Sequence, residues 1–406
     1  MAVPPILDVF VVWHPEDPVG GIVLEQLTKH FHSPAFAGLA GGAVEVYGRS
    51  VGWEGPGAAP RPLGIEEALT GILPRAQFNA IVPLVSTPMA RAYRDEPSWM
   101  AYIDRLVTLH SSEGVGVYPL RAPNSEITGS LLAGCLASIQ ALPRECAGNA
   151  GVLGREVSQA IAQRVGVGDG LKDRIRVFVS HTKHDSLEEA DQDGPALFEA
   201  VRQVIAGTRL ATFFDAQDLQ SGADWELELD ENAANCALLM VRTDRYSSRE
   251  WTQREVLAAK RHDVPIVEMY ALTQGEERGS FLMDHVPSVP CDTKQPNGDI
   301  ELALNRLVDE ALKRALWLAQ TMYLHEDGFD WTPVHSPEPV TLAPWLEVHK
   351  REQPEDNHVW IIHPDPPLGP KEREVVTALC SLAGFTKNVD VLTPRTFAAR
   401  GGRLAK

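Results

Sequence analysis

The sequence predicts an α/β protein built on doubly wound parallel sheets of flavodoxin-like type, and three short segments carry most of this prediction. DVFVVWHPED begins at Asp8, RVFVSHTKHD at Arg176 and HVWIIHPDPP at His358. Each is a β-branched and aromatic run that leads through a His into a turn containing Asp, and then into a helical pattern. A buried strand that delivers polar residues to a loop before a helix opens a doubly wound unit. We therefore expect three related units.

The length of 406 residues corresponds to roughly two or three domains. The repeated segments and the changes in composition between them set the expected boundaries. We expect an α/β domain at 1–122, a helical connector at 123–172, a second α/β domain at 173–322, a linker at 323–356 and the start of a third α/β unit at 357–406.

Hydrophobic patterning predicts four strands and three helices in the first domain. The strands are expected at 8–13, 43–47, 79–85 and 116–119, and the helices at 21–31, 65–72 and 98–110. Several Gly and Pro residues between Val51 and Leu63 predict a loop. The connector is expected to be helical in its middle, over the sequence SLLAGCLASIQAL that begins at Ser130.

The second domain has the clearest alternation of strand and helix patterns. Strands are expected at 175–179, 210–214, 236–241 and 264–270, and helices at 195–206, 225–235, 248–262 and 300–320. This alternation implies a parallel sheet with helices on both faces. Ser247 or Ser248 is the expected N-cap of the helix at 248–262.

The third unit has one strand from His358, a helix at 372–382 and a second strand at 388–392. Two strands and a helix cannot bury a doubly wound core, so this piece either packs on a neighbouring unit or continues beyond Lys406. It shares features with the first unit: HPDP matches HPED, and Arg395 follows its second strand as Arg49 does in the first. These features suggest the start of a Rossmann-like nucleotide-sensing domain.

Charge and cysteine usage narrow the possible partners. The formal net charge is −18, from 37 basic and 55 acidic side chains, which argues against an extended nucleic-acid interface. The five cysteines are scattered and form no CxxC pair, so we expect reduced, structural thiols and no bound metal. No apolar run is long enough to span a bilayer and the N-terminus lacks the features of a signal peptide, so we expect a cytoplasmic protein without a membrane partner.

Ligands of open α/β sheets bind beyond the carboxyl ends of the strands. In the second domain these ends carry Ser180 and His181, then Asp215, Asp218 and Gly222, and then a run of charged residues from Arg242 to Tyr246. The next helix contains Trp251 and Glu255, which are four residues apart and therefore lie on one helical face. We expect this pair near the cleft.

These pieces together resemble a Toll/interleukin-1 receptor (TIR) domain. RVFVSHTKHD, FFDAQDLQSGADW, CALLMVRTDRYSS and REWTQREV follow one another in the order of that family, from Arg176 to about Tyr270. The WxxxE helix is similar to that of bacterial and plant TIR domains that cleave NAD⁺. The resemblance implies that Glu255 is the catalytic residue and that Asp215–Trp225 is the loop that gates the nucleotide pocket and mediates assembly.

The resemblance further implies an NAD⁺ nucleosidase that releases nicotinamide and either ADP-ribose or cyclic ADP-ribose. NAD⁺ would be the substrate, with no cofactor required, and the setting would be bacterial antiviral defence by an oligomerising effector with an activating ligand or partner protein. The alternative is a signalling scaffold that acts only by TIR–TIR self-association. The residues expected to contact substrate are Ser180, His181, Asp215, Asp218, Gly222, Trp225 and Trp251.

The chemistry suits a single carboxylate. Cleavage of the nicotinamide–ribose bond builds oxocarbenium charge on the sugar, which a carboxylate can stabilise as in glycoside hydrolysis. Nicotinamide already leaves as a neutral molecule from a cation, so a proton donor is not obligatory.

The first domain lacks this acid. Its helix at 98–110 contains Trp99, and the residue four positions later is Ile103. Its loop after the second strand also lacks the DxxDLxxG pattern. The first domain is therefore either a degenerate TIR-like unit or an unrelated flavodoxin-like domain, and the sequence leaves both open. It also leaves open the trigger, the cyclic or linear product and the oligomer geometry.

Overall fold

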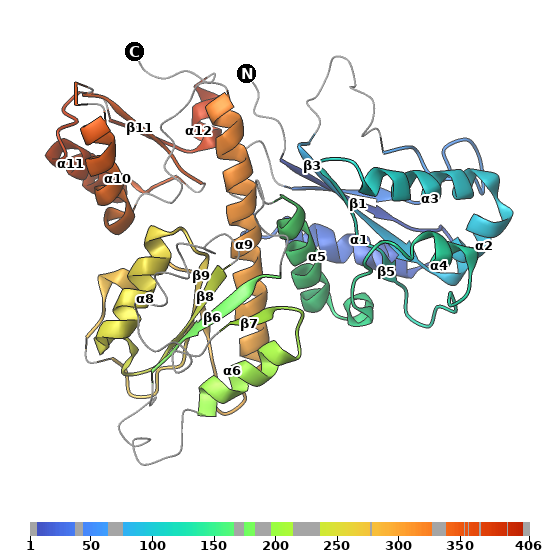
Figure 1. Cartoon of the computed structure of the whole chain (residues 1–406), viewed down its shortest axis with the longest axis horizontal. Coiled ribbons are helices and arrows are strands. Elements are labelled where there is room, and N and C mark those ends of the chain that lie inside the picture. The colour runs from blue at the N-terminus through green and yellow to red at the C-terminus, as the bar shows by residue number, and fades with distance from the viewer. Residues whose placement is uncertain are drawn as a thin grey trace. The chain divides into compact units, whose positions relative to one another are not determined.

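The computed structural model describes residues 6–36, 44–63, 76–165, 174–182, 196–213, 236–276, 278–326, 338–352, 354–355, 357–364, 367–387 and 389–400. They form an α/β protein with parallel sheets and flanking helices, as the sequence predicts (Figure 1). Two compact units divide the chain. One comprises Met1–Val165 with Pro394–Arg403, and the other comprises Gly166–Thr393 with Leu404–Lys406.

The first unit contains a parallel sheet with the strand order β2-β1-β3-β4, in which β5 also pairs with β3. Its strands are β1 (Leu7–Val12), β2 (Glu45–Arg49), β3 (Phe78–Val85), β4 (Val115–Val117) and β5 (Leu120–Arg121). Val12 of β1 pairs with Arg49 of β2 on one side and with Pro83 of β3 on the other. The order therefore reverses direction at β1, which makes its carboxyl end a topological switch point.

The helices of the first unit are α1 (Val19–Phe31), α2 (Thr87–Asp95), α3 (Pro97–His110), α4 (Leu131–Cys135) and α5 (Ala150–Val165). Patterning does not predict α2, because only Met89 and Ala92 of this helix are buried. Its start is fixed locally by Ser86, whose hydroxyl accepts a hydrogen bond from the Met89 N–H. Helices α2 and α3 cover one face of the sheet, where Trp99 and Ile103 pack on Phe10.

The predicted helix in the middle of the connector is wrong in extent. Only Leu131–Cys135 is helical there, and the longer helix is α5, whose start is capped by Asn149. The Asn149 side chain accepts hydrogen bonds from the backbone N–H groups of Gly151 and Val152. Pro143 follows the apolar run around α4 and separates it from α5. The helix expected at 65–72 lies outside the described residues.

The second unit contains a parallel sheet with the order β10-β9-β8-β6-β7. Its strands are β6 (Arg176–Ser180), β7 (Ala211–Phe213), β8 (Cys236–Arg242), β9 (Ile266–Tyr270) and β10 (Ser288–Pro290). Four of them match predicted strands, and β10 is an additional edge strand of three residues. The central strand β8 is buried along its length up to Val241, which explains its continuous apolar sequence.

The sheet of the second unit is flanked by α6 (Ala196–Ala206), α8 (Glu250–Arg261) and α9 (Asn297–Glu326). Helix α8 buries Val256 and Ala259 against Phe178 and Leu238 of the sheet. Lys260, near the end of α8, is also buried, and its ammonium group donates to the Asp284 carbonyl at 2.8 Å and to the Glu338 carboxylate at 2.7 Å. The helix expected at 225–235 lies outside the described residues.

The segment expected to be a linker at 323–356 contains a helix, α10 (Pro339–Glu352). Leu342 and Leu346 of α10 are buried in a small core with β11 (Val359–Ile362), α11 (Pro370–Leu382) and β12 (Val389–Leu392). The exposed polar side chains around these two leucines, and Pro344 within the helix, hide its periodicity from a sequence reading. A short helix, α12 (Pro394–Ala399), belongs to the first compact unit.

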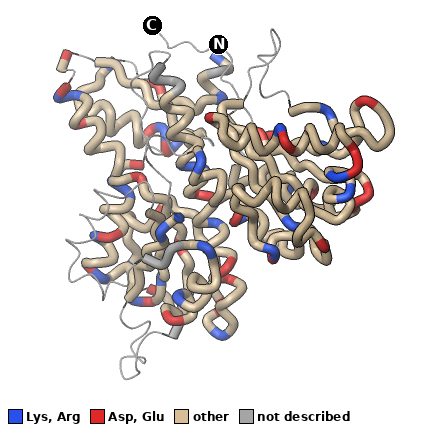
Figure 2. The backbone as a smooth tube through the Cα atoms, turned by 45° about the vertical axis from the view of Figure 1, so that its right-hand side comes forward, with Lys and Arg blue, Asp and Glu red and all other residues tan. Residues whose placement is uncertain are grey.

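None of the five cysteines, all of which are among the described residues, forms a disulfide. Among the described residues, no helix is both long and apolar enough to cross a membrane, and no group of His, Cys, Asp and Glu could hold a metal ion. Figure 2 shows Lys and Arg interspersed with Asp and Glu along the described backbone.

Candidate functional site

The parallel sheet of the second unit brings the ends of β6 and β8 together. Ser180 is the last residue of β6 and pairs in register with Met240 of β8. Beyond this pair, the hydroxyl groups of Thr182 and Thr243 lie 3.0 Å apart and join the two loops that leave the sheet. Polar side chains from two separate segments therefore meet at one point on the carboxyl edge.

Glu255 lies on α8 and reaches this edge. Its Oε2 accepts a hydrogen bond from the Ser180 hydroxyl at 2.5 Å, and the Ser180 Oγ lies 2.5 Å from the phenol oxygen of Tyr246. Ser180 has a single hydroxyl hydrogen, which it gives to Glu255, so Tyr246 donates to Ser180. The three side chains form a directed chain of hydrogen bonds that ends on the Glu255 carboxylate.

The three side chains are almost completely buried, with 5% of Glu255 exposed and Ser180 and Tyr246 sealed. Burial raises the pKa of Glu255 to about 7, against the opposing effect of the Ser180 hydrogen bond. Burial also raises the pKa of Tyr246 well above its ordinary value, and the nearby Glu255 charge adds to this rise. Tyr246 is therefore a neutral donor, whereas Glu255 changes its charge near neutral pH.

The start of α8 differs from the sequence prediction. Ser247 and Ser248 do not cap the helix, because they belong to a 3₁₀ turn at Tyr246–Ser248, and Arg249 is the N-cap residue. The Ser247 hydroxyl instead donates to the Glu276 carboxylate. Thr252, in the first turn of α8, donates to the Tyr246 carbonyl at 2.7 Å and thereby ties the helix to the turn that presents Tyr246.

An ion cluster fixes the end of β8 beside this site. Arg242 makes a bidentate pair with Glu276, at 2.7 and 2.6 Å, and a further bond of 2.6 Å to Glu268 of β9. Burial pushes the pKa of Glu276 upward, but the hydrogen bonds from Arg242 and Ser247 outweigh burial and lower it. Two buried carboxylates on one guanidinium hold the strand end in a single arrangement.

Asp244 closes the next turn of the chain. Its carboxylate accepts hydrogen bonds from the backbone N–H groups of Thr273, Gln274 and Gly275, and from the Thr273 hydroxyl. The loop after β8 is therefore fastened to the loop after β9. These contacts position Tyr246 two residues later.

Two further residues of the predicted site, His181 and Trp251, are described, and neither has a contact with Glu255 among the contacts described. The His181 ring is buried and stacks on Phe198 of α6 at 3.8 Å, with its Nδ1 2.8 Å from the Thr182 carbonyl. Trp251 is 41% exposed, and its ring lies under the Arg249 guanidinium at 5.4 Å. The structure thus brings Ser180 to Glu255, whereas Trp251 contacts Arg249 at the surface. Asp215, Asp218, Gly222 and Trp225 lie outside the described residues.

Sequence reasoning did not include Tyr246 or Arg242 among the site residues. Both were visible as polar residues after a buried strand, and Tyr246 opens the YSS turn that supports the family resemblance. Their partners, however, lie 66 and 34 residues away in the chain, at Ser180 and Glu276. No local pattern encodes such pairings.

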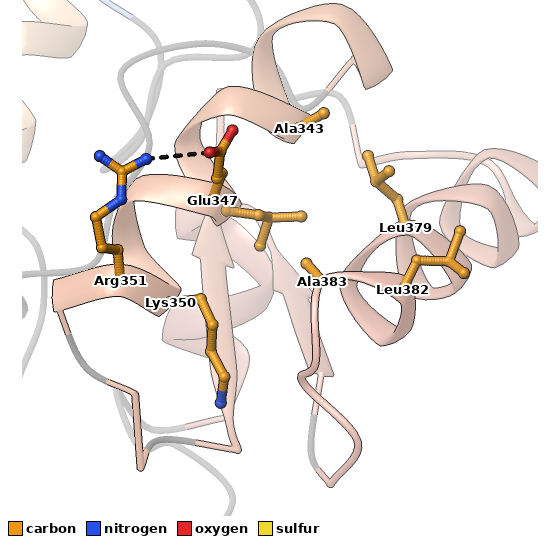
Figure 3. Close-up of a pocket in the computed structure, with 8 residues that line it drawn as sticks. Ala343, Glu347, Lys350, Arg351, Leu379, Leu382 and Ala383 are labelled. Atoms are coloured by element: carbon orange, nitrogen blue, oxygen red, sulfur yellow. Dashed lines mark hydrogen bonds and ion pairs between the residues drawn. The ribbon is translucent and has the colours of Figure 1, made fainter.

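A groove of about 470 Å³ lies elsewhere, between α10 and α11 (Figure 3). Leu346, Leu379 and Leu382 give it an apolar lining, and Glu347 pairs with Arg351 at its rim at 3.0 Å. None of the described residues of the predicted site lines this groove. Its carboxylate, Glu347, is exposed and paired with Arg351, so the candidate site remains the buried Glu255 cluster.

Comparisons with known proteins do not identify a family for this chain. No family model matches the chain, and no curated protein matches it. A candidate tagatose-6-phosphate ketose/aldose isomerase from Clostridium novyi NT aligns at 10% identity over 78% of this chain and 79% of its own, with a TM-score of 0.19. The tagatose-6-phosphate ketose/aldose isomerase from Escherichia coli aligns at 10% identity over 78% and 83%, with a TM-score of 0.20. Such low scores carry no argument about fold or chemistry, so the interpretation rests on the chain's own residues.

Proposed function

We propose that this protein is a TIR-type NAD⁺ nucleosidase in which Glu255 is the catalytic carboxylate. The observation that carries the proposal is the buried Glu255 carboxyl group at the carboxyl edge of the sheet, bonded to Ser180 and titrating near pH 7. Perturbed carboxyl groups at this edge of an α/β sheet are typical of functional sites. The strand order of the second unit, β7-β6-β8-β9-β10, agrees with a flavodoxin-like TIR arrangement and supports the proposal.

In the proposed reaction, the bond between nicotinamide and C1′ of the ribose breaks, and its electron pair goes to the nicotinamide nitrogen. The ionised Glu255 stabilises the positive charge that develops on the sugar. Water then attacks C1′ and releases a proton to solvent, which gives ADP-ribose. Attack by an adenine nitrogen in place of water gives the cyclic product.

The Tyr246–Ser180 pair has a positioning role in this proposal. Ser180 directs its hydrogen to Glu255 and so favours the ionised carboxylate that the reaction needs. Tyr246 holds Ser180 in the orientation that makes this possible. Both side chains are sealed from solvent, so neither is assigned direct contact with NAD⁺.

A comparison of two glutamates on one helix tests the assignment. Glu255→Gln keeps the size of the side chain and its capacity to accept from Ser180, and we expect nicotinamide release to fall about a hundredfold or more. Glu250→Gln is the matched control, because Glu250 is an exposed residue of the same helix that pairs only with Arg254 among the contacts described. Release should be unchanged in this control.

The measurement is nicotinamide formation from NAD⁺ by the full chain, with and without forced clustering. Clustering is included because TIR domains of this type are proposed to act as oligomers, in which one copy completes the site of the next. Equal nicotinamide release by Glu255→Gln and the parent protein would reject the catalytic assignment. No release from the parent protein under any condition would favour the scaffold, which acts by self-association without cleaving NAD⁺.

A further inference from the structure

A second group of polar side chains lies at the carboxyl edge of the sheet in the first unit. Three of its hydrogen-bond donors, Arg49 Nε, Trp99 Nε1 and Tyr102 Oη, are buried and have no partner within the described part of the chain. Trp99 is fully buried and Tyr102 nearly so, while Arg49 is half-buried. Buried donors are normally satisfied, so a concentration of unsatisfied ones requires an explanation.

These donors and His14 come from three segments, namely the end of β2, the loop after β1 and the start of α3. Arg49 ends β2 and pairs in register with Val12 of β1, and His14 follows on the same face of the sheet two residues later. The His14 ring contacts Trp99 at 5.3 Å, and Trp99 contacts Tyr102 at 6.1 Å. Arg49 is also close enough to Tyr102 for its positive charge to lower the pKa of the phenol, although burial raises that pKa by more. The four side chains therefore meet at the carboxyl end of β1, on the face of the sheet that α3 covers.

This cluster offers mainly hydrogen-bond donors. The indole of Trp99 and the guanidinium of Arg49 can only donate hydrogen bonds. The Nδ1 of His14 accepts the Glu16 backbone N–H at 3.3 Å, which leaves its Nε2 as the donor in the neutral ring. No carboxylate pairs with Arg49 in the described residues, and its guanidinium lies over the rings of Phe10 and Tyr47. A set of donors with one uncompensated positive charge matches a ligand that presents several acceptor oxygens.

The position in the fold agrees with this chemistry. The cluster lies where the strand order reverses at β1, the place at which open α/β sheets bind ligands. We propose that Arg49, Tyr102 and His14 bind the phosphate group of a small molecule, and that Trp99, which is sealed from solvent, positions the His14 and Tyr102 rings. Arg49 supplies the charge, and Tyr102 and His14 donate hydrogen bonds to the phosphate oxygens. This site lies in the other compact unit from Glu255 and stands independently of the proposed nucleosidase activity.

Binding is measured by calorimetry on the full chain, at constant ionic strength in chloride, with inorganic phosphate, AMP and adenosine as probes. We expect AMP to bind and adenosine not to bind. Binding of phosphate as well identifies the free anion as a sufficient ligand, and binding of AMP alone identifies a nucleoside phosphate. Absence of binding by both phosphate and AMP, or equal binding of adenosine and AMP, overturns the proposal.

Two tyrosines of the same unit provide matched variants. Tyr102→Phe removes only the unpartnered hydroxyl, so the free protein should not lose stability while affinity for the phosphate probe falls about tenfold or more. The Tyr118 hydroxyl already donates to the Ala160 carbonyl at 3.0 Å, so Tyr118→Phe should lower the melting temperature and leave the affinity unchanged. Arg49→Met should abolish measurable binding. Parent affinity in Tyr102→Phe, or an equal loss in Tyr118→Phe, overturns the assignment, and this result does not depend on whether Arg49→Met folds.

Discussion

Helices α3 and α8 carry a tryptophan at corresponding positions, and the two tryptophans have opposite environments. Trp99 of α3 is 0% exposed, and Ile103, four residues later, is 1% exposed. In α8, Trp251 is 41% exposed, whereas Glu255 at the same spacing is 5% exposed. In α3 both residues point into the core. In α8 the aromatic ring lies at the surface and the carboxyl group points inward.

The difference shows what a four-residue spacing specifies. It sets the relative position of two side chains on a helix, but not the rotation of that helix over the sheet. The neighbours decide whether the inward position can hold an acid. Ile103 is surrounded by an apolar cluster, whereas Glu255 meets the hydroxyl of Ser180. The acid at the second position of α8 meets a hydrogen-bond donor because β6 ends in a serine.

Truncation of the two tryptophans should separate these environments most strongly. Trp99→Ala leaves a cavity in the core, and we expect a loss of about 3–5 kcal/mol in the free energy of unfolding. Trp251→Ala removes a surface contact with Arg249 and should cost about 1 kcal/mol or less. Denaturant unfolding of both variants measures the difference. Similar losses would mean that Trp251 is also a packing residue.

The pH dependence of stability isolates the buried carboxyl group. The pKa of Glu255 is about 7 in the folded protein, against an ordinary value of 4.5, so the folded state keeps a proton that the unfolded state loses. Between these two values, stability should therefore fall as pH rises, by about 3 kcal/mol in total. Glu255→Gln should be close to the parent protein at pH 4 and more stable at pH 8. A stability difference that does not change with pH would exclude a raised pKa at this position.

Ser180→Ala removes two hydrogen bonds, one to Glu255 and one from Tyr246, and should cost about 2 kcal/mol of stability. Its effect on titration has a definite sign, because the Ser180 hydrogen bond lowers the pKa of Glu255. Removing this bond raises that pKa further, so the pH at which nicotinamide release reaches half its maximum should move upward. The pH–rate profiles of parent and variant provide the measurement. A shift toward lower pH would contradict the proposed role of Ser180.

Sequence patterning predicts the elements that are buried along most of their length. Strand β8 appears as an unbroken apolar run, and the strand at Leu7–Val12 as a β-branched one, so both are placed correctly. Helices α2 and α10 bury only two residues each and escape detection. The strand pairing of each sheet joins segments that are distant in the chain, which local patterns do not contain.

The same limit applies to the candidate site. Glu255 and Ser180 follow from the strand-end rule together with the family resemblance, and the structure joins them at 2.5 Å. The inward orientation of Glu255, the sealed position of Tyr246 and the ion cluster around Arg242 arise from tertiary packing. The exposed position of Trp251 also follows from the rotation of α8, which its sequence alone does not reveal.

The Lys260–Glu338 ion pair ties the proposed catalytic helix α8 to the segment that leads into α10. Lys260 follows Glu255 by five residues on α8, and only 3% of its side chain is exposed, so its ammonium group relies on a carboxylate from the residue before α10. Loss of one member of a buried pair costs about 3–5 kcal/mol, because the remaining charge has no solvent to stabilise it. A chain that ended before Glu338 would retain every candidate catalytic residue. The buried charge of Lys260, on the helix that carries Glu255, would then lack its carboxylate partner. The segment that begins at Glu338 is therefore part of the structure that supports the helix of Glu255.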